Sequence, residues 1–536
     1  MTAVEGLLSM AVLKDKCLPQ ATHQQIEHIH ESLLFYDEHT FGASESVSDP
    51  LCENSQVQWG EKSAYAWEAV KRTQMLYETS VGLLQGDLRR GKNPTLTIFN
   101  TLNWKRSEML TVYIDFEVIP RNQFFEITDF QGHSLKVQPI RYRREGCYYA
   151  IFAEDIPPMG YKTFEIVFKQ PSTDTGTITI NNASIENHFY KLQLNPDKGT
   201  IQSLYDKELN CELVDSSSPW ELGAFIYEKL GNRDQLAQYR LDDYNRTGLS
   251  ECRIIDSSNG PIYQRILLQG KSPGTDEAFG VNLEIKLYHD TKRIELEYAI
   301  KRLPETDPSG IYVAFPFQLP EGKLAFDVQG GTVISGKNQL EGTSTDWNTV
   351  QNFVSVQNNQ AQIIIGSSLI PLYQLGDINL GKFQYQKQYE RPHVYSWVMN
   401  NYWNTNFKAS QEGEFRWSYH LTSSVDPSNN LATKFGWSSR IPLYARVMPT
   451  GTENHKPTEY SAFHFEKDNF LMTSCTPSKE EGYILLNIRE IDGKRTNLRI
   501  LNEDGQTIPF TIVNAIEEKL ENETSEHIFE GTRINL

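Results

Sequence analysis

The spacing of apolar residues changes at Pro94, and this change constrains the fold more than any other feature. Before it, residues 20–35 and 55–88 repeat apolar side chains at the three-to-four-residue spacing of an amphipathic helix. After it, short β-branched and aromatic runs alternate with turn residues, which is typical of strands. We therefore predict a helical bundle over residues 1–92, followed by a mainly β chain.

The β region divides into three predicted domains. Strand-like runs over residues 93–180 predict a β-sandwich that ends in a linker rich in Ser, Thr and Asn. Residues 181–438 hold strand-like runs almost without helix, which predicts a large two-sheet sandwich. Residues 439–536 predict a small terminal β-sandwich. With 536 residues, the chain is long enough for several domains of ordinary size.

The balance of charges argues against a nucleic-acid partner. Asp and Glu together number 69 and Lys and Arg together 51, so the formal net charge is −18 at pH 7. Phosphate binding needs a basic patch, and no basic stripe stands out in the sequence. Tyr and Phe number 26 each, and such aromatic enrichment suits both strands and surfaces that stack on sugar rings.

The cysteines and the N-terminus predict a cytoplasmic protein. The six cysteines lie far apart without a Cys-x-x-Cys pair, which fits isolated thiols in a reducing compartment. Residues 1–8 have no basic stretch ahead of their short apolar run, unlike a signal peptide. No run of about 18 apolar residues could span a membrane, so we expect no membrane segment.

A compact polar cluster, Asp37-Glu38-His39, lies where the predicted helix runs into Gly42. Oxygen and nitrogen donors of this kind suit Zn²⁺ or a similar divalent ion. Three or four ligands must converge on such an ion, and we interpret the upstream histidines His23, His28 and His30 as surface or packing residues. By itself His39 fits a turn or capping histidine as well as a metal ligand.

Asp37 and Glu38 cannot form the catalytic carboxylate pair of a glycosidase. Adjacent residues on a helix diverge by about 100°, whereas such a pair must flank one glycosidic bond. The sequence also contains no nucleophile elbow, phosphate loop or dinucleotide fingerprint.

A second cluster, residues 395–407, interleaves asparagine with tryptophan and tyrosine. The amide of Asn401 could bond sugar hydroxyls while the ring of Trp403 stacks on the sugar face. A buried strand followed by an ordinary turn explains the same pattern.

Several stretches resemble glycoside hydrolase family 38, the α-mannosidase family. Residues 36–46 are similar to its zinc-histidine segment, and residues 186–192 with 195–209 are similar to the opening of its C-terminal β domain. Further similar stretches follow, in the order of the family and over nearly the whole chain: residues 157–161, 346–351 and 396–407.

This resemblance implies an N-terminal α/β catalytic domain, a helical bundle and then β domains, the largest of the galactose-mutarotase-like supersandwich type. It also implies a retaining mechanism with one Zn²⁺, for which His39 would be a ligand. Asp37, Glu38, Asn401 and Trp403 are the expected substrate-binding residues. No catalytic residue is assigned in this chain, because the nucleophile and the acid are expected on the N-terminal domain.

Two hypotheses follow from the sequence. In the first, the chain is the C-terminal portion of an α-mannosidase acting on α-mannosides or related glycans. It is then catalytic only when joined to the absent N-terminal domain or paired with a separately encoded one. We then expect an inactive isolated chain, poor zinc affinity and an exposed apolar surface around residues 1–45. In the second, it is a non-catalytic β-sandwich protein that binds carbohydrate or scaffolds a partner.

Overall fold

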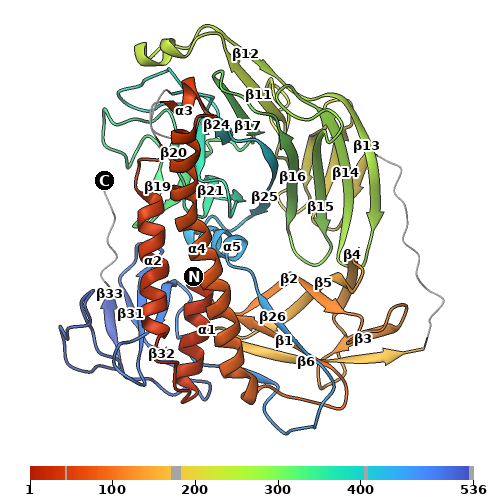
Figure 1. Cartoon of the computed structure of the whole chain (residues 1–536), viewed down its shortest axis with the longest axis vertical. Helices are drawn as coiled ribbons and strands as arrows, with labels where there is room; N and C mark the ends of the chain where they lie inside the picture. Colours follow the sequence, from red (N-terminus) through yellow and green to blue (C-terminus); the bar gives the residue numbers. More distant parts are fainter. Residues whose placement is uncertain (43–44, 171–182, 404–407, 530–536) are drawn as a thin grey trace. The chain divides into compact units, whose positions relative to one another are not determined.

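The computed structural model confirms a mainly β protein with helices near the N-terminus (Figure 1). The part of the chain that the structure describes comprises residues 1–42, 45–170, 183–403 and 408–529. Within it, no helix is both long and apolar enough to cross a membrane.

The chain forms two compact units, which we describe separately. Unit 1 comprises Met1–Asp37, Ser63–Gly176 and Pro442–Arg533. Unit 2 comprises Glu38–Lys62, Thr177–Ile441 and Ile534–Leu536. The predicted boundary between residues 180 and 181 falls outside the described residues, and the predicted four-domain division stays a prediction.

Two helices form where the apolar spacing predicts them: α2 (Thr22–Asp37) and α4 (Glu53–Leu84), which begins in unit 2. The helix α1 (Thr2–Leu13) precedes them in unit 1. The turn-length helices α3 (Glu45–Ser48) and η1 (Gln85–Asp87) accompany them. One side chain of α2 and several of the other two helices share an apolar core that consists of Val4, Leu8, Ile29, Ala69 and Leu76. Burial of these residues, rather than intrinsic propensity, holds such helices in place.

A β-sandwich follows the helices in the chain. One sheet has the order β26-β1-β6-β27 with β3 paired to β6, and the other has the order β2-β5-β4. The first sheet consists of β1 (Thr95–Asn100), β3 (Phe124–Thr128), β6 (Gly160–Lys169), β26 (Tyr444–Met448) and β27 (Glu459–Ser461). The second consists of β2 (Arg106–Asp115), β4 (Lys136–Tyr142) and β5 (Gly146–Ile156). Leu96, Ile98, Val112, Ile151 and Phe164 belong to the core between them.

The C-terminal segment contributes to unit 1 in two ways. Two of its strands, β26 and β27, extend the first sheet of the sandwich. The rest form two-stranded sheets: β28 (His464–Phe465) with β32 (Ile500–Leu501), β29 (Phe470–Pro477) with β30 (Ile484–Glu490), and β31 (Thr496–Leu498) with β33 (His527–Phe529). These strands share an apolar core with α1, through Leu7 and Met10 against Phe470 and Met472.

Unit 2 is built on two large antiparallel sheets, in agreement with the predicted large sandwich. The nine-stranded sheet has the order β13-β14-β15-β16-β25-β22-β21-β18-β19, and the six-stranded sheet the order β12-β11-β17-β24-β23-β20. The apolar core has members on both sheets, such as Ile285, Leu296 and Tyr419 on one and Phe225, Val313 and Val394 on the other.

The strands of unit 2 have the following bounds. The nine-stranded sheet holds β13 (Ser250–Asn259), β14 (Tyr263–Lys271), β15 (Val281–Tyr288), β16 (Ile294–Arg302), β18 (Lys323–Val328), β19 (Gly331–Ile334), β21 (Phe353–Gln357), β22 (Gln362–Gly366) and β25 (Gly413–Ser424). The six-stranded sheet holds β11 (Phe225–Leu230), β12 (Tyr244–Thr247), β17 (Ser309–Phe315), β20 (Asn348–Thr349), β23 (Leu372–Leu375) and β24 (Val394–Asn400). A four-stranded sheet holds β7 (Ser184–Glu186), β8 (Tyr190–Asn195), β9 (Thr200–Asp206) and β10 (Cys211–Glu212).

The helix α5 (Asn429–Arg440) is an addition that the sequence analysis missed. Its first turn is capped by Ser428, whose Oγ accepts a hydrogen bond from the amide of Leu431 at 3.3 Å. Ala432 packs with Phe353 and Ile364 of neighbouring strands, so α5 covers part of the nine-stranded sheet.

Candidate functional site

The Asp37-Glu38-His39 motif lies at the C-terminal end of α2, where the chain turns. Glu38 organises this turn, because its carboxylate accepts hydrogen bonds from the Thr40 amide at 3.0 Å and the Thr40 hydroxyl at 2.8 Å. Lys62 of α4 holds the same residue, donating to the Glu38 carbonyl at 2.7 Å and to its carboxylate at 3.2 Å. The bonds from Thr40, with those from Lys62, lower the pKa of Glu38 below its ordinary value.

His39 projects into solvent. Its side chain is 86% exposed, and its Nδ1 lies 2.8 Å from Oε1 of Glu38. The other ring nitrogen of His39, Nε2, has no hydrogen-bond partner among the described residues. Asp37 is exposed as well, so the three polar residues form a rim rather than an enclosed cavity.

The donor set around His39 does not by itself fit a zinc ion. Zinc sites need three or four converging nitrogen, sulfur or oxygen ligands. Among the residues that the structure describes, no three His, Cys, Asp or Glu side chains lie close enough together to hold a metal. His39 can therefore be at most one ligand of a site completed from elsewhere.

Replacement of His39 should leave the fold intact. We expect His39→Ala to change the free energy of unfolding by no more than about 0.5 kcal/mol, because the side chain is exposed. Urea denaturation of both proteins measures this. Glu38→Ala is the contrasting variant: it removes the acceptor of Lys62 and Thr40, so it should lower the free energy of unfolding by more than His39→Ala does. A larger loss from His39→Ala than from Glu38→Ala would contradict this description of the motif.

Asn401 and Trp403 lie just beyond the end of β24. The side chain of Asn401 is buried and bonds to the backbone on both sides: Oδ1 accepts from the Ser309 amide at 2.7 Å, and Nδ2 donates to the Glu305 carbonyl at 2.9 Å. These bonds give Asn401 a structural role, and its contact with sugar hydroxyls stays a prediction. Residues 404–407 of the predicted cluster lie outside the described part of the chain.

Trp403 is half-buried in an aromatic cluster. Its ring centroid lies 5.5 Å from that of Trp347 and 6.0 Å from those of Trp397 and Tyr402. Such contacts orient the ring and leave only part of it accessible.

Trp59 of α4 lies beside Gly42 and Lys408, each of which is close in sequence to one of the predicted clusters. A methyl group added to Gly42, whose φ is +131°, would come within 3.0 Å of Trp59 Nε1. On the other side, the Lys408 ammonium lies 5.0 Å from the centre of the Trp59 ring. The structure thus brings the two segments to the same region, although no described contact joins His39 to Asn401 or Trp403.

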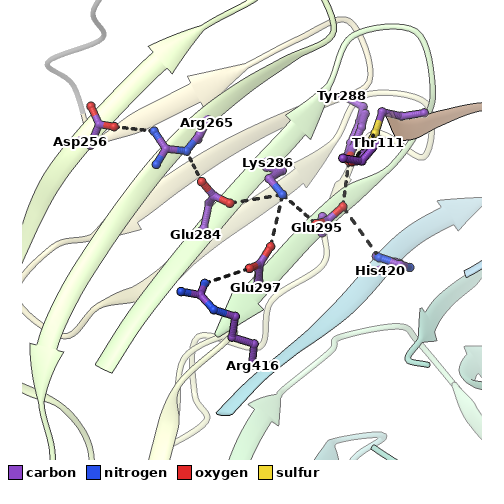
Figure 2. Close-up of polar contacts among 11 residues, drawn as sticks. Thr111, Asp256, Arg265, Glu284, Lys286, Tyr288, Glu295, Glu297, Arg416 and His420 are labelled. Atoms are coloured by element: carbon purple, nitrogen blue, oxygen red, sulfur yellow. Dashed lines mark hydrogen bonds and ion pairs between the residues drawn. The ribbon is translucent and has the colours of Figure 1, made fainter. Parts of the chain in front are cut away.

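A row of charged residues crosses β14, β15, β16 and β25, and sequence reasoning did not single it out (Figure 2). Lys286 is its centre, with Nζ 2.9 Å from Glu295, 3.2 Å from Glu284 and 3.5 Å from Glu297. Arg265 and Arg416 continue the row toward Glu284 and Glu297. The sequence does contain a pattern that could have predicted this row. Glu284 and Lys286, like Glu295 and Glu297, are two residues apart, and alternate residues of a strand share one face of the sheet.

The carboxylate of Glu295 is buried and ionised. Burial alone would raise its pKa, but the Lys286 ammonium outweighs burial and holds the pKa far below the ordinary value. The Tyr288 hydroxyl donates a further hydrogen bond to Glu295 at 2.8 Å. Removal of one member of such a buried ionic group would leave its partners uncompensated.

His420 is the titratable group of this row that should govern stability in mild acid. Burial, together with Arg293 and Lys286, lowers its pKa to about 3 despite the neighbouring Glu295. In the unfolded chain the pKa is about 6.5, so on acidification the unfolded chain binds the proton first. The stability that neutral His420 contributes is therefore present above about pH 6.5 and lost as the pH falls toward 3.

We expect this group to lower the free energy of unfolding by about 2 kcal/mol between pH 7 and pH 5. Urea denaturation at both values, for the natural chain and for His420→Asn, isolates its share, because all other titrating groups are common to both proteins. An equal pH dependence in the two proteins would contradict the lowered pKa.

Comparisons with known proteins find a family match within unit 2. Residues 185–383 match the glycosyl hydrolases family 38 C-terminal domain. No curated protein matches the sequence.

Two solved structures share the fold over almost the whole chain. An alpha-mannosidase from Enterococcus faecalis V583 covers 97% of this chain with a TM-score of 0.72 at 13% sequence identity. A protein in the glycosyl hydrolase family 38 from Enterococcus faecalis also covers 97%, with a TM-score of 0.70 at 14% identity. This chain covers 63% of the first and 66% of the second, a little under two thirds of each.

A third structure, a galactose mutarotase-like protein from Lactobacillus casei ATCC 334, covers 46% of this chain and 100% of its own at 13% identity. Its TM-score of 0.28 is too low to bear on the fold. The supersandwich type of the large domain therefore stays a prediction.

Proposed function

This chain carries the C-terminal domain of glycosyl hydrolase family 38, and from this premise we propose that it is the C-terminal portion of an α-mannosidase-type glycoside hydrolase. The family match over residues 185–383 is the observation that carries the proposal. The shared fold with an alpha-mannosidase, of which this chain covers 63%, supports it. The proposed substrates are α-mannosides or related glycans.

Catalysis in this proposal needs a further α/β domain. The nucleophile and the acid of a retaining glycosidase would come from that domain, since Asp37 and Glu38 cannot flank one bond. A separate polypeptide could supply it. The chain described here would contribute the rim of the site, with the carboxylates of Asp37 and Glu38 as acceptors for sugar hydroxyls.

An apolar helix surface supports the docking of such a domain. At the end of α2, Leu34 is 72% and Phe35 51% exposed, and on α4, Trp67 is 70% and Met75 55% exposed. The rings of Phe35 and Tyr65 stack with their centroids 5.4 Å apart, which joins the end of α2 to α4. Trp67 and Met75 are exposed on another side of α4, about 160° and 80° around the helix from Tyr65. Large apolar side chains gathered on a surface are typical of interaction sites. We call Leu34, Phe35, Trp67 and Met75 the docking face.

His39 is proposed as the one zinc ligand that this chain contributes. Its exposed imidazole lies three residues beyond the end of the exposed Leu33–Tyr36 run, where a domain bound to the docking face could reach it. Zinc in such a site polarises sugar oxygens and stabilises developing charge. The remaining ligands would belong to the α/β domain.

Hydrolysis of a nitrophenyl α-mannoside by the purified chain with added Zn²⁺ tests this division of roles. We expect no turnover, because in this proposal the nucleophile, the acid and the remaining zinc ligands belong to the α/β domain. Turnover that His39→Ala abolishes would overturn the proposal, since the chain would then hold a complete site.

A non-catalytic carbohydrate-binding role is the second candidate, favoured by the partly accessible ring of Trp403. The coding sequence upstream discriminates the two. An α/β domain with a His-x-Asp pair there would favour the hydrolase, and its absence would favour the binding protein.

A further inference from the structure

Unit 2 contains a hollow of about 430 Å³ where β11 and β12 meet their connecting loop. These strands are labelled near the top of Figure 1. Its lining includes Lys229, Gly231, Asp243, Tyr244, Asn245 and Asp307. Small-molecule sites occupy about 300–1,000 Å³, so the hollow has the size of a ligand site. We call it the β11–β12 pocket.

Strand pairing and the hydrogen bonds of Gln235 hold the backbone that lines this pocket. In the antiparallel pair, Leu230 lies opposite Tyr244 and Lys229 opposite Asn245. Buried Gln235, in the connecting loop, accepts hydrogen bonds from the amides of Asp242 at 3.0 Å and Asp243 at 3.1 Å, and donates to the Asp243 carbonyl at 3.0 Å. Pre-organised walls of this kind lower the entropic cost of binding.

The carboxylate of Asp243 can lie against the backbone of residue 231 because that residue is glycine. A Cβ atom on Gly231 would come within 2.0 Å of Asp243 Oδ2, which no side chain tolerates. The Gly231 amide also donates to the Asp243 carbonyl at 3.0 Å. Gly231 thus allows the acid to lie against the backbone and line the pocket.

The ring of Tyr244 is held by a charged neighbour. The Arg246 guanidinium lies 4.4 Å from the ring centre, and Arg246 is itself bonded to fully buried Glu228. Tyr244 is 39% exposed, so part of the ring is accessible to a ligand.

Three polar side chains of the pocket make no hydrogen bond within the described residues, whereas Lys229 and Asp307 are paired. No hydrogen bond within the described part of the chain uses the Asp243 carboxylate, the Tyr244 hydroxyl or the Asn245 amide. Lys229 donates to Glu305 at 2.8 Å and to Asp307 at 3.1 Å. Two carboxylates and one ammonium line the hollow, so its net charge disfavours anionic ligands.

We propose that the β11–β12 pocket binds a neutral sugar residue. The accessible ring of Tyr244 offers an apolar face, the Asp243 carboxylate accepts from ring hydroxyls, and the Asn245 amide both donates and accepts. This combination suits a polyhydroxylated ring. The proposal goes beyond the proposed hydrolase function, because binding here needs neither the α/β domain nor hydrolysis.

Saturation-transfer NMR and calorimetric titration of the full chain with methyl α-mannoside and methyl β-galactoside test the pocket. The variants are Asp243→Ala, Tyr244→Ala and Gly231→Ala, the last of which displaces the acid without removing it. Asp242→Ala is the matched control, because Asp242 is an exposed acid on the same loop, paired with Arg240 at 3.1 Å and absent from the lining.

We expect saturable binding of at least one sugar to the natural chain. Asp243→Ala and Tyr244→Ala should weaken it by about tenfold or more, and Asp242→Ala by less than about twofold. Circular dichroism and the thermal midpoint confirm the fold of each variant, and Tyr244→Phe replaces Tyr244→Ala if the latter does not fold.

No saturable sugar binding, or equal binding by Asp243→Ala, would overturn the proposal. Tighter binding of methylammonium than of either sugar would also overturn it, since the acids would then serve a cation. The assay involves no hydrolysis, so its failure leaves the proposed enzymatic function untouched, and failure of that function leaves this site untouched.

Discussion

Glu228→Ala is expected to lower the free energy of unfolding by about 3–5 kcal/mol. The carboxylate of Glu228 is fully buried and bonded to the Arg246 guanidinium. It also accepts hydrogen bonds from the hydroxyls of Tyr312, at 3.2 Å, and Tyr402. Truncation would leave one buried cation and two buried hydroxyls without their acceptor.

Urea denaturation monitored by tryptophan fluorescence measures this loss. Glu228→Gln retains one acceptor oxygen and should fall between the natural chain and Glu228→Ala. The matched control is Glu251→Ala, because Glu251 is exposed and its pair with Lys271 lies on the surface. Its effect should stay within about 0.5 kcal/mol. A Glu228→Ala chain as stable as the natural one would contradict the assigned network.

Leu34→Asp combined with Trp67→Asp is expected to abolish the association of this chain with the proposed α/β domain. Both side chains are highly exposed in this chain, so the fold should tolerate the exchange. In a complex they would be buried, each contributing about 1.5–3 kcal/mol. Their loss, with two carboxylates placed in the interface, should weaken binding at least about 100-fold.

Co-purification and analytical ultracentrifugation of the two polypeptides measure the association. Gln24→Asp, an exposed substitution in the first turns of α2 and away from the docking face, is the control and should bind normally. Unchanged binding by the double variant would exclude the docking face as the site of contact.

The helices and the mainly β class were predictable because they depend on local spacing. The periodic apolar residues before Pro94 predicted α2 and α4. Of the region 1–45, where an exposed apolar surface was expected, Leu34 and Phe35 are exposed, whereas residues 3–11 are buried. The helix α5 was missed because it is short: Leu431, Ala432 and Phe435, which pack in an apolar core, cover little more than one turn among polar residues.

Sheet order was not predictable from local pattern. The strand β26 pairs with β1 over residues about 350 positions apart, with Leu96 opposite Val447. Such pairing depends on the folded arrangement and leaves no periodic signal in either segment.

The candidate site was predictable only in part. The sequence identified His39 as a polar residue at a helix end, but not the bonds from Lys62 that fix the turn. The β11–β12 pocket was missed because Gly231, Asp243 and Asp307 are ordinary turn residues, separated in sequence and brought together by two strand pairings.

The central claim is that this chain completes a family 38 α-mannosidase site without forming one alone. Hydrolysis of a nitrophenyl α-mannoside by this chain mixed with a family 38 α/β domain, in the presence of Zn²⁺, tests it most directly. We predict turnover by the mixture, none by either polypeptide alone, and loss of turnover in the mixture containing His39→Ala. Full activity of the α/β domain without this chain, or of this chain without the domain, would contradict the claim.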